Sequence, residues 1–379
     1  MRRVVILTEI IAPYRIPVFN ALARTAGIDL HVIFLSKTDT SMRQWRVYEN
    51  EIKFSYEVLP GWRRRFGKYN VLLNYRLGEA LSQSRPGVIV CGGYNYLASW
   101  QAMRWARRHR VRFVLWSEST AQDSRSEHLL VESLKREFLK RCTGFVVPGH
   151  AAQEYLLRLR VPPPKIFMAR NAVDLKLFSN SAEAISQQAD RVRAELALPD
   201  RYFLFVGRLV RAKGVLDLIE AYASLPAELR SEIGLVYVGD GPLRSELEAA
   251  ARDIFPGLVH FAGFVDRDQL PAYYKLAECL VLPTHSDTWG MVINEAMACS
   301  LPVICTHVAG CAADLIKNNG RLVAPGNVTQ LAAAMREIAN NSDLRLRMSR
   351  ESQTLIQEFS PETCAAGIAQ ASLALEAHV

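Results

Sequence analysis

With 379 residues, half of them hydrophobic, and a formal net charge of +8, the chain can bury substantial cores and has the size of roughly two or three domains, of which we expect two. Its first apolar run, residues 4–7, is far too short for the core of a signal peptide, and no later run reaches membrane-spanning length. The seven cysteines form no CxxC pair and mostly lie in apolar runs, so we expect reduced, buried thiols and a soluble cytoplasmic protein.

The first half of the chain alternates strands and helices. Short runs rich in Val, Ile and Phe are separated by helix-length amphipathic stretches, which indicates a parallel sheet covered on both faces. The expected strands are residues 4–8, 29–35, 87–91, 112–116 and 144–147. The expected helices lie after Pro13, near 70–82, and over 96–109 and 127–142.

The same alternation begins again at Tyr202, and residues 173–178 are the expected linker before it. Ser360 followed by Pro361 predicts the start of a last helix, because serine caps helices and proline suits the first helical position. The expected second-half strands are residues 202–206, 235–238, 258–262, 279–282 and 303–305.

We therefore predict an α/β fold of two Rossmann-like, doubly wound domains, residues 1–175 and 176–359, facing across a cleft. A helix within residues 360–379 is expected to pack back toward the N-terminal domain. Ligands of such sheets bind at the carboxyl ends of the strands, so the chemistry is expected there.

The charge is unevenly distributed between the halves. Residues 1–175 hold 28 Lys and Arg against 14 acidic residues, a net charge of +14, whereas the remainder holds 18 against 24, a net charge of −6. Much of the excess comes from WRRRFGKY at 62–69 and RWARRHRVR at 104–112. An anionic membrane surface, a lipid phosphate or a nucleic acid would each suit the basic half, as would a merely solvated face. No nucleic-acid-binding module is recognisable, so we expect no nucleic acid partner.

The first chemical motif is VGRLVRAKG, in which a strand ends at Val206 and the loop after it carries Arg208 and Lys213. Two cations at a strand's carboxyl end can hold a diphosphate and stabilise the charge that develops as a nucleotide diphosphate leaves, a task otherwise given to a metal ion. Such a pair is also common as solvated surface groups. No cluster has metal-ligand spacing, so we expect no metal and no cofactor.

Two shorter motifs follow. VGDGPL contains a tight turn that needs glycine dihedrals, and we interpret it as structural. In HFAGFV, Gly263 and Phe264 lie at the end of a strand. A base could be read there by backbone groups, with Phe264 or Val265 closing over it.

The strongest segment is LVLPTHSDTWGMVINEAMACSLPVI, a strand, a polar loop and a helix that opens near Gly290. Gly290 lets the backbone approach an anion at the helix N-terminus. Glu295, eight residues after Asp287, is placed to accept hydrogen bonds from a ribose diol. The alternative is that Asp287 caps the helix and Glu295 lies on an amphipathic face.

Together these four motifs, in this order, resemble glycosyltransferase family 4, a group of retaining enzymes with the GT-B fold. RLRVPPPKIFMARNAVDLKLF is similar more weakly, and EIIAPYRIPVFNALA resembles the opening of a bacterial subgroup involved in surface polysaccharide assembly. The resemblance implies transfer of a hexose from a UDP- or GDP-sugar to a glycan or lipid-linked acceptor. It also leaves room for peripheral contact with the inner face of a membrane through the basic domain.

The resemblance also implies residue roles. Arg208 and Lys213 would grip the donor diphosphate, Glu295 would bind the ribose, and Asp287 would hold sugar hydroxyls. Backbone groups of three successive residues would contact sugar and phosphate: Trp289, Gly290 and Met291.

The sequence departs from the family pattern in several places. Asp287 stands where the family most often has Glu, Asn171 is followed by Ala172 instead of Gly, and residues 12–14 replace a glycine-rich loop. Many relatives place a histidine where this chain reads FVLWSEST; Glu118 is our candidate for that catalytic position, the alternative being an ordinary loop carboxylate. Three rival functions stay open: a nucleotide-sugar epimerase on the same fold, a catalytically inactive nucleotide-sugar-binding protein, and a nucleic-acid-binding protein, which only the basic half suggests.

Overall fold

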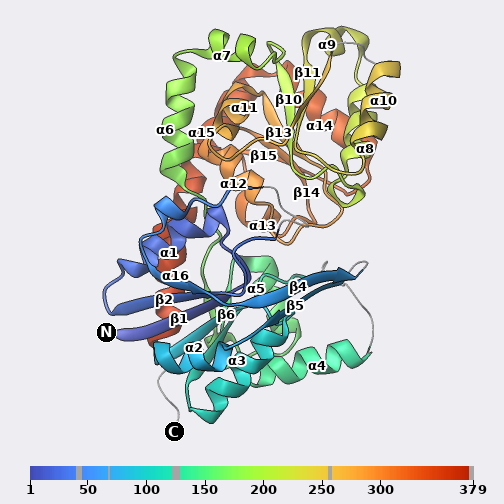
Figure 1. Ribbon diagram of the computed structural model, residues 1–379. Coiled ribbons are helices and arrows are strands. Elements are labelled where there is room, and N and C mark those ends of the chain that lie inside the picture. The colour runs from blue at the N-terminus through green and yellow to red at the C-terminus, as the bar shows by residue number, and fades with distance from the viewer. Residues whose placement is uncertain (40–44, 67–68, 122–128, 255–257, 375–379) are drawn as a thin grey trace. The chain divides into compact units, whose positions relative to one another are not determined.

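The computed structural model describes residues 1–39, 45–66, 69–121, 129–254 and 258–374 (Figure 1). The chain divides into two compact units, Met1–Val173 with Ser360–Val379, and Asp174–Phe359. Each unit is built on a parallel sheet, so the predicted α/β class with two Rossmann-like domains is confirmed. Within the described residues, no helix has both the length and the apolar character needed to span a membrane.

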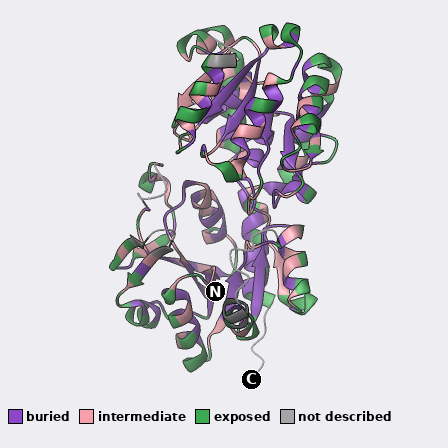
Figure 2. Cartoon of the chain, turned by 90° about the vertical axis from the view of Figure 1, so that its right-hand side faces the viewer, coloured by how far each residue is buried: buried purple, intermediate pink, exposed green. Residues whose placement is uncertain are grey.

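The sheet of the first unit has seven parallel strands, and its central strands are buried on both faces. Alternate side chains of its strand β1 enter different cores, Val4 and Ile6 on one face, Val5 and Leu7 on the other. Figure 2 shows the buried strands between exposed outer helix surfaces. In sheet order the strands are β3 (Ser55–Val58), β2 (Ile28–Phe34), β1 (Arg2–Thr8), β6 (Val88–Gly92), β7 (Arg112–Trp116), β8 (Gly144–Val147) and β9 (Ile166–Met168).

Helices cover both cores of this sheet. One core is covered by α1 (Ile16–Ala23) and α16 (Pro361–Ala374). A Cβ at Gly367 of α16 would lie 2.0 Å from the carbonyl oxygen of Met168, so the last helix meets β9 backbone to backbone. The other core is covered by α2 (Leu77–Ser84), α3 (Leu97–Arg108), α4 (Leu129–Lys140) and α5 (His150–Arg158).

The helix predicted near residues 70–82 is wrong in its first part. β4 (Gly61–Phe66) and β5 (Tyr69–Asn74) form an antiparallel hairpin, with Trp62 opposite Leu73, and α2 begins only at Leu77. A short apolar run such as that of β5 cannot be assigned to helix or strand by its periodicity, and here the pairing with β4 decides.

The second unit has a six-stranded parallel sheet. The strands of the two sheets follow the same order. Numbered along the chain within each sheet, they lie side by side as 3-2-1-4-5-6, which is the strand order of dinucleotide-binding folds. The first unit has a seventh strand next to the sixth. The strands are β12 (Val259–Gly263), β11 (Gly234–Val238), β10 (Tyr202–Val206), β13 (Cys279–Leu282), β14 (Val303–Thr306) and β15 (Gly320–Val323).

Residues 173–178, predicted as a linker, are mostly helical. Asp174 accepts a hydrogen bond from the backbone N–H of Leu177 at 3.0 Å and caps α6, so the change of unit falls between Val173 and Asp174. The helices of this unit are α6 (Leu175–Ser186), α7 (Ala189–Glu195), α8 (Val215–Ala223), α9 (Ala227–Glu232), α10 (Arg244–Ile254), α11 (Leu270–Leu276), α12 (Met291–Ala298), α13 (Ala312–Leu315), α14 (Val328–Asn340) and α15 (Ser342–Leu355).

Candidate active site

Three loops at the carboxyl ends of β10, β11 and β13 are hydrogen-bonded to one another. The backbone N–H of Leu209 donates to the carbonyl of Asp240 at 3.0 Å, and that of His285 donates to Ala212 at 2.9 Å. Segments far apart in the sequence therefore form one continuous edge, as expected for adjacent parallel strands.

Glycines make this close approach possible. A Cβ at Gly239 would lie 2.0 Å from the carbonyl oxygen of Gly207, and one at Gly214 would lie 1.9 Å from that of Pro283. Gly239 also has a φ of 128°, a conformation that other residues rarely adopt. The packing supports a structural interpretation of the VGDGPL turn.

Lys213 and Asp287 form an ion pair at this edge. Lys213 Nζ donates a short hydrogen bond to Asp287 Oδ2, and the two side chains are 24% and 14% exposed. Lys213 ends the 3₁₀ turn Arg211–Lys213 after β10, and Asp287 lies in the loop between β13 and α12. Asp287 Oδ1 also accepts from the backbone N–H of Trp289 at 3.5 Å. Two predicted site residues are thus in direct contact.

Arg208, in the same loop as Lys213, is exposed. Within the described part of the chain, no carboxylate pairs with its guanidinium group. Its N–H donors are therefore available to an anion, in contrast to the ammonium group of Lys213.

The loop after β13 ends in the N-terminus of α12. Gly290 has a φ of 98° and precedes the first helical residue, Met291. The Trp289 indole is buried and its Nε1 donates to Asn294 Oδ1 at 2.8 Å, so this side chain belongs to the core. The contact with sugar and phosphate that the sequence predicts for Trp289 can therefore involve only its backbone groups.

Glu295 lies one turn further along α12 and is partly buried. Tyr274 Oη donates to its Oε2 at 2.7 Å. Burial raises the pKa of Glu295 to about 7, although the Tyr274 hydrogen bond and the charge of Arg267 act in the opposite direction. The carboxyl group therefore changes charge close to neutral pH.

The HFAGFV segment ends the edge strand β12. Gly263 has a φ of 72°, and its carbonyl accepts from the N–H of Gly239 at 2.7 Å. Phe264 is 44% exposed, whereas Val265 is partly buried. An exposed aromatic ring at a strand end suits contact with a planar group.

In the first unit, Glu118 follows β7 and is paired with Arg15. Arg15 Nη2 donates a short hydrogen bond to Glu118 Oε1; the side chains are 14% and 34% exposed. Arg15 also donates to Asn171 Oδ1 at 3.2 Å, and its guanidinium lies 4.0 Å from the ring centroid of Trp116. Sequence reasoning missed Arg15, although it directly follows the segment that replaces the glycine-rich loop.

A second ionic group of the first unit was also missed. Arg63 of the hairpin pairs with Glu9 at 3.1 Å and with Asp39 at 2.6 Å, and Asp39 is buried. Glu9 directly follows β1, so the hairpin is tied to the carboxyl end of that strand.

Cysteines and potential metal ligands give no further site within the described residues. All seven cysteines are unpaired and buried. Among the residues with a described position, no three His, Cys, Asp or Glu side chains are grouped as they would be around a metal ion.

Two family models match the chain, each over less than half of it and together over most of it. The model described as "Glycosyl transferases group 1" matches residues 186–355, and that described as "Glycosyltransferase Family 4" matches residues 18–177.

Several curated proteins are similar in sequence. The chain is 29% identical over 274 residues to a 2-deoxystreptamine glucosyltransferase of Streptomyces kanamyceticus, which covers 69% of this chain and 68% of that protein. It is 34% identical over 187 residues to a D-inositol 3-phosphate glycosyltransferase of Streptomyces coelicolor (46% of this chain, 41% of that protein). With an O-antigen chain mannosyltransferase B of Escherichia coli the identity is 27% over 168 residues, 43% of each chain. The last two matches span less than half of the relative's length.

Solved structures match nearly the whole chain. HepE of Anabaena, in a complex with UDP, has a TM-score of 0.73 at 17% identity and covers 98% of this chain and 99% of its own. A sucrose-phosphate synthase of Thermosynechococcus elongatus has a TM-score of 0.72 at 21% identity and covers 98% of both chains. Likeness at these identities concerns the fold, and it agrees with the predicted GT-B class.

Proposed function

The chain belongs to the group 1 glycosyl transferases (glycosyltransferase family 4), and on that premise we propose that it transfers a hexose from a UDP- or GDP-sugar to a glycan or lipid-linked acceptor with retention of anomeric configuration. The complexes of HepE with UDP and with UDP-glucose support a nucleotide sugar as donor. The similarity to an O-antigen chain mannosyltransferase B supports a role in surface polysaccharide synthesis.

The observation that carries the proposal is the meeting of Lys213, Asp287 and the start of α12 at one sheet edge, with Arg208 in the adjoining loop. We assign the donor diphosphate to Arg208 and Lys213. An ammonium group has three donors, so Lys213 can keep its bond to Asp287 while it binds a phosphate oxygen. The free amides of Gly290 and Met291 at the helix N-terminus supply further donors to an anion.

The sugar and the nucleoside are assigned to the neighbouring groups. Asp287 keeps acceptor capacity beyond its bond to Lys213 and would receive sugar hydroxyls. Glu295 would accept hydrogen bonds from the ribose diol. Phe264 would cover the base, while Val265 and the backbone of Gly263 border it.

Retention follows in this proposal from attack on the face that the diphosphate leaves. The acceptor oxygen forms a bond to the anomeric carbon, the bond from that carbon to the diphosphate oxygen breaks, and the hydroxyl proton passes to a diphosphate oxygen. Arg208 and Lys213 stabilise the charge that grows on the diphosphate, and because they are already positioned they need little reorganisation. We propose that this stabilisation suffices without a metal ion.

The acceptor is assigned to the basic first unit, since the residues assigned to the donor diphosphate and nucleoside all belong to the second. Glu118, oriented by Arg15, is our candidate for a contact with the donor sugar. We further propose a cytoplasmic enzyme that touches the inner face of an anionic membrane through the basic unit.

The test is a contrast between two variants. Glu295→Gln keeps the shape of the side chain but weakens charge-assisted hydrogen bonds worth about 1.5–3 kcal/mol each, so donor affinity should fall at least tenfold. Arg208→Ala should lower turnover about 100-fold or more beyond any change in affinity, because the charge it meets is larger in the transition state. Donor binding by calorimetry and transfer by product analysis separate the two.

Controls on the same unit are Glu220→Gln and Arg336→Ala, both at exposed positions. If both site variants fold normally and match the controls in affinity and rate, the site assignment is wrong. Consumption of donor without acceptor would show an epimerase instead, and donor binding with no turnover in the unmodified protein would show an inactive binder.

A further inference from the structure

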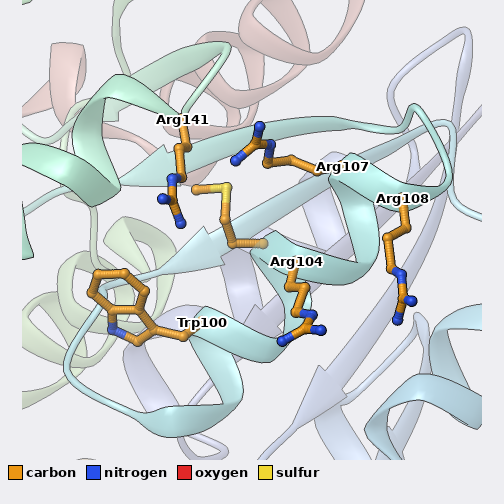
Figure 3. Close-up of a pocket in the computed structure, with 6 residues that line it drawn as sticks. Trp100, Arg104, Arg107, Arg108 and Arg141 are labelled. Carbon is orange, nitrogen blue, oxygen red and sulfur yellow. The ribbon is translucent and has the colours of Figure 1, made fainter.

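The helical layer of the first unit contains a hollow of about 520 Å³. Figure 3 shows the guanidinium groups of Arg104, Arg107 and Arg108 from α3 and of Arg141 from the end of α4 around it. A second hollow, of about 350 Å³, shares Arg104 and Arg108 with it. The lining of the larger hollow is Trp100, Met103, Arg104, Arg107, Arg108 and Arg141.

Most of its charge is uncompensated. Arg141 pairs with Glu137 at 2.6 Å, but no carboxylate of the described residues pairs with Arg104, Arg107 or Arg108. Like charges gathered around a concavity repel one another and attract anions. The hollow therefore favours an anionic occupant.

Cations at a helix C-terminus are also common without any ligand, since they complement the helix dipole. The side chains at the floor of this hollow indicate a ligand site in addition to this dipole effect. Met103 is buried, and Trp100 is fixed because its Nε1 donates to the carbonyl of Tyr94 at 3.1 Å and its ring packs edge-on against Phe138 at 4.8 Å. A fixed apolar floor bordered by several polar groups is typical of a ligand site.

The hollow is separate from the proposed transfer chemistry. α3 starts just after the carboxyl end of β6 and runs back along the sheet, so Arg107 and Arg108 in its last turn lie roughly 15 Å from its start at 1.5 Å per residue. Glu118 and Arg15 lie at the carboxyl end of the strands. An anion held by Arg107 and Arg108, in the last turn of α3, is thus not the reacting group.

We propose that this hollow binds the phosphate headgroup of an anionic membrane lipid. Guanidinium groups match phosphate oxygens in charge and geometry. Leu97 at the start of α3 and Leu134 on α4 are 54% and 57% exposed, so the helices next to the hollow also expose apolar side chains, as membrane-surface helices do. The hollow would be the place where the enzyme of the proposed function touches the membrane, and none of the proposed donor-site residues line it.

The test is sedimentation with vesicles of phosphatidylglycerol and phosphatidylcholine. Arg104→Gln with Arg107→Gln should weaken binding at least tenfold, because each arginine near an anionic surface contributes about 1 kcal/mol. The matched control, Arg136→Gln with Lys140→Gln, removes two exposed charges from α4 that do not line the hollow, and should weaken binding less than threefold. Equal losses in both pairs, or no binding by the unmodified protein, would overturn the proposal.

Two further measurements identify the source of the phosphate. Leu97→Ser with Leu134→Ser should weaken vesicle binding and leave binding of glycerol phosphate, measured by calorimetry, unchanged. Tight glycerol phosphate binding without any vesicle binding would overturn the lipid assignment. UDP binding, measured on the same variants, should not change; failure of the unmodified protein to bind any nucleotide would instead count against the proposed function.

Discussion

The two units share one strand order but build the carboxyl edges of their sheets by different means. In the second unit, glycines let the backbones of the loops after β10, β11 and β13 touch, and the Lys213–Asp287 ion pair adds to this contact. In the first unit, backbone hydrogen bonds such as that from the N–H of Ser36 to the carbonyl of Glu9 are joined by two ion pairs between distant residues, Arg15 with Glu118 and Arg63 with Glu9. An edge built from backbone is encoded in short glycine-containing segments, whereas an edge built from ion pairs depends on residues scattered along the chain.

The largest effect is expected from adding one methyl group to the backbone-built edge. Gly239→Ala would place a Cβ 2.0 Å from the carbonyl of Gly207 at a φ of 128°, and should lower the free energy of unfolding by about 3 kcal/mol or more. Gly93→Ala in the first unit is the matched control, since Gly93 has a φ of 91° with nothing within 4 Å of its Cβ. It should cost only about 1–2 kcal/mol from the backbone conformation. Urea unfolding compares them, and equal losses would show that strain and not packing governs the loop.

A smaller effect is expected at the ion-paired edge. Arg15→Ala leaves Glu118 without its cation, and because Glu118 is one-third exposed we expect a loss of about 2 kcal/mol and not the larger cost of a fully buried pair. The double variant with Glu118→Ala should be less destabilised than the sum of the single variants by about 1 kcal/mol. Additive losses in urea unfolding would mean that the two side chains do not stabilise each other.

Donor affinity should depend on pH through Glu295. Its pKa of about 7 in the free protein means that lowering the pH from 8 to 6 converts most of the carboxylate to the neutral acid, which accepts ribose hydroxyls poorly. Affinity for the nucleotide sugar should therefore rise about tenfold from pH 6 to pH 8. Calorimetry across this range checks it, with Glu295→Gln expected to show a flat profile. A pH dependence that survives in this variant would have to come from another group.

The smallest effect is expected from removing metal ions. Transfer should continue in EDTA at the same rate, because the proposal gives charge stabilisation at the diphosphate to Arg208 and Lys213. Loss of all activity that magnesium or manganese restores would refute this assignment.

The sequence predicted most of what is made from continuous segments. The central strands of both sheets are apolar along their length because both faces are buried, and the loop motifs of the second unit lie next to strand ends that this pattern locates. The β4–β5 hairpin was not predicted because a short apolar run such as β5 does not show by itself whether it is a helix or a strand. Its pairing with β4 decides that, and the pairing is seen only in the structure. Glu118 was singled out, but not its partner Arg15, since no local pattern links residues 103 positions apart.

The return of α16 to the first unit has a consequence for biosynthesis. Residues 361–374 complete the core that α1 covers, so the unit translated first is the last whose core can close. The second unit, by contrast, has left the ribosome entirely once Phe359 has emerged. A nascent chain halted after Phe359 should therefore contain a folded second unit and a first unit whose apolar core is still uncovered by α16. We expect a chaperone to bind this uncovered apolar surface.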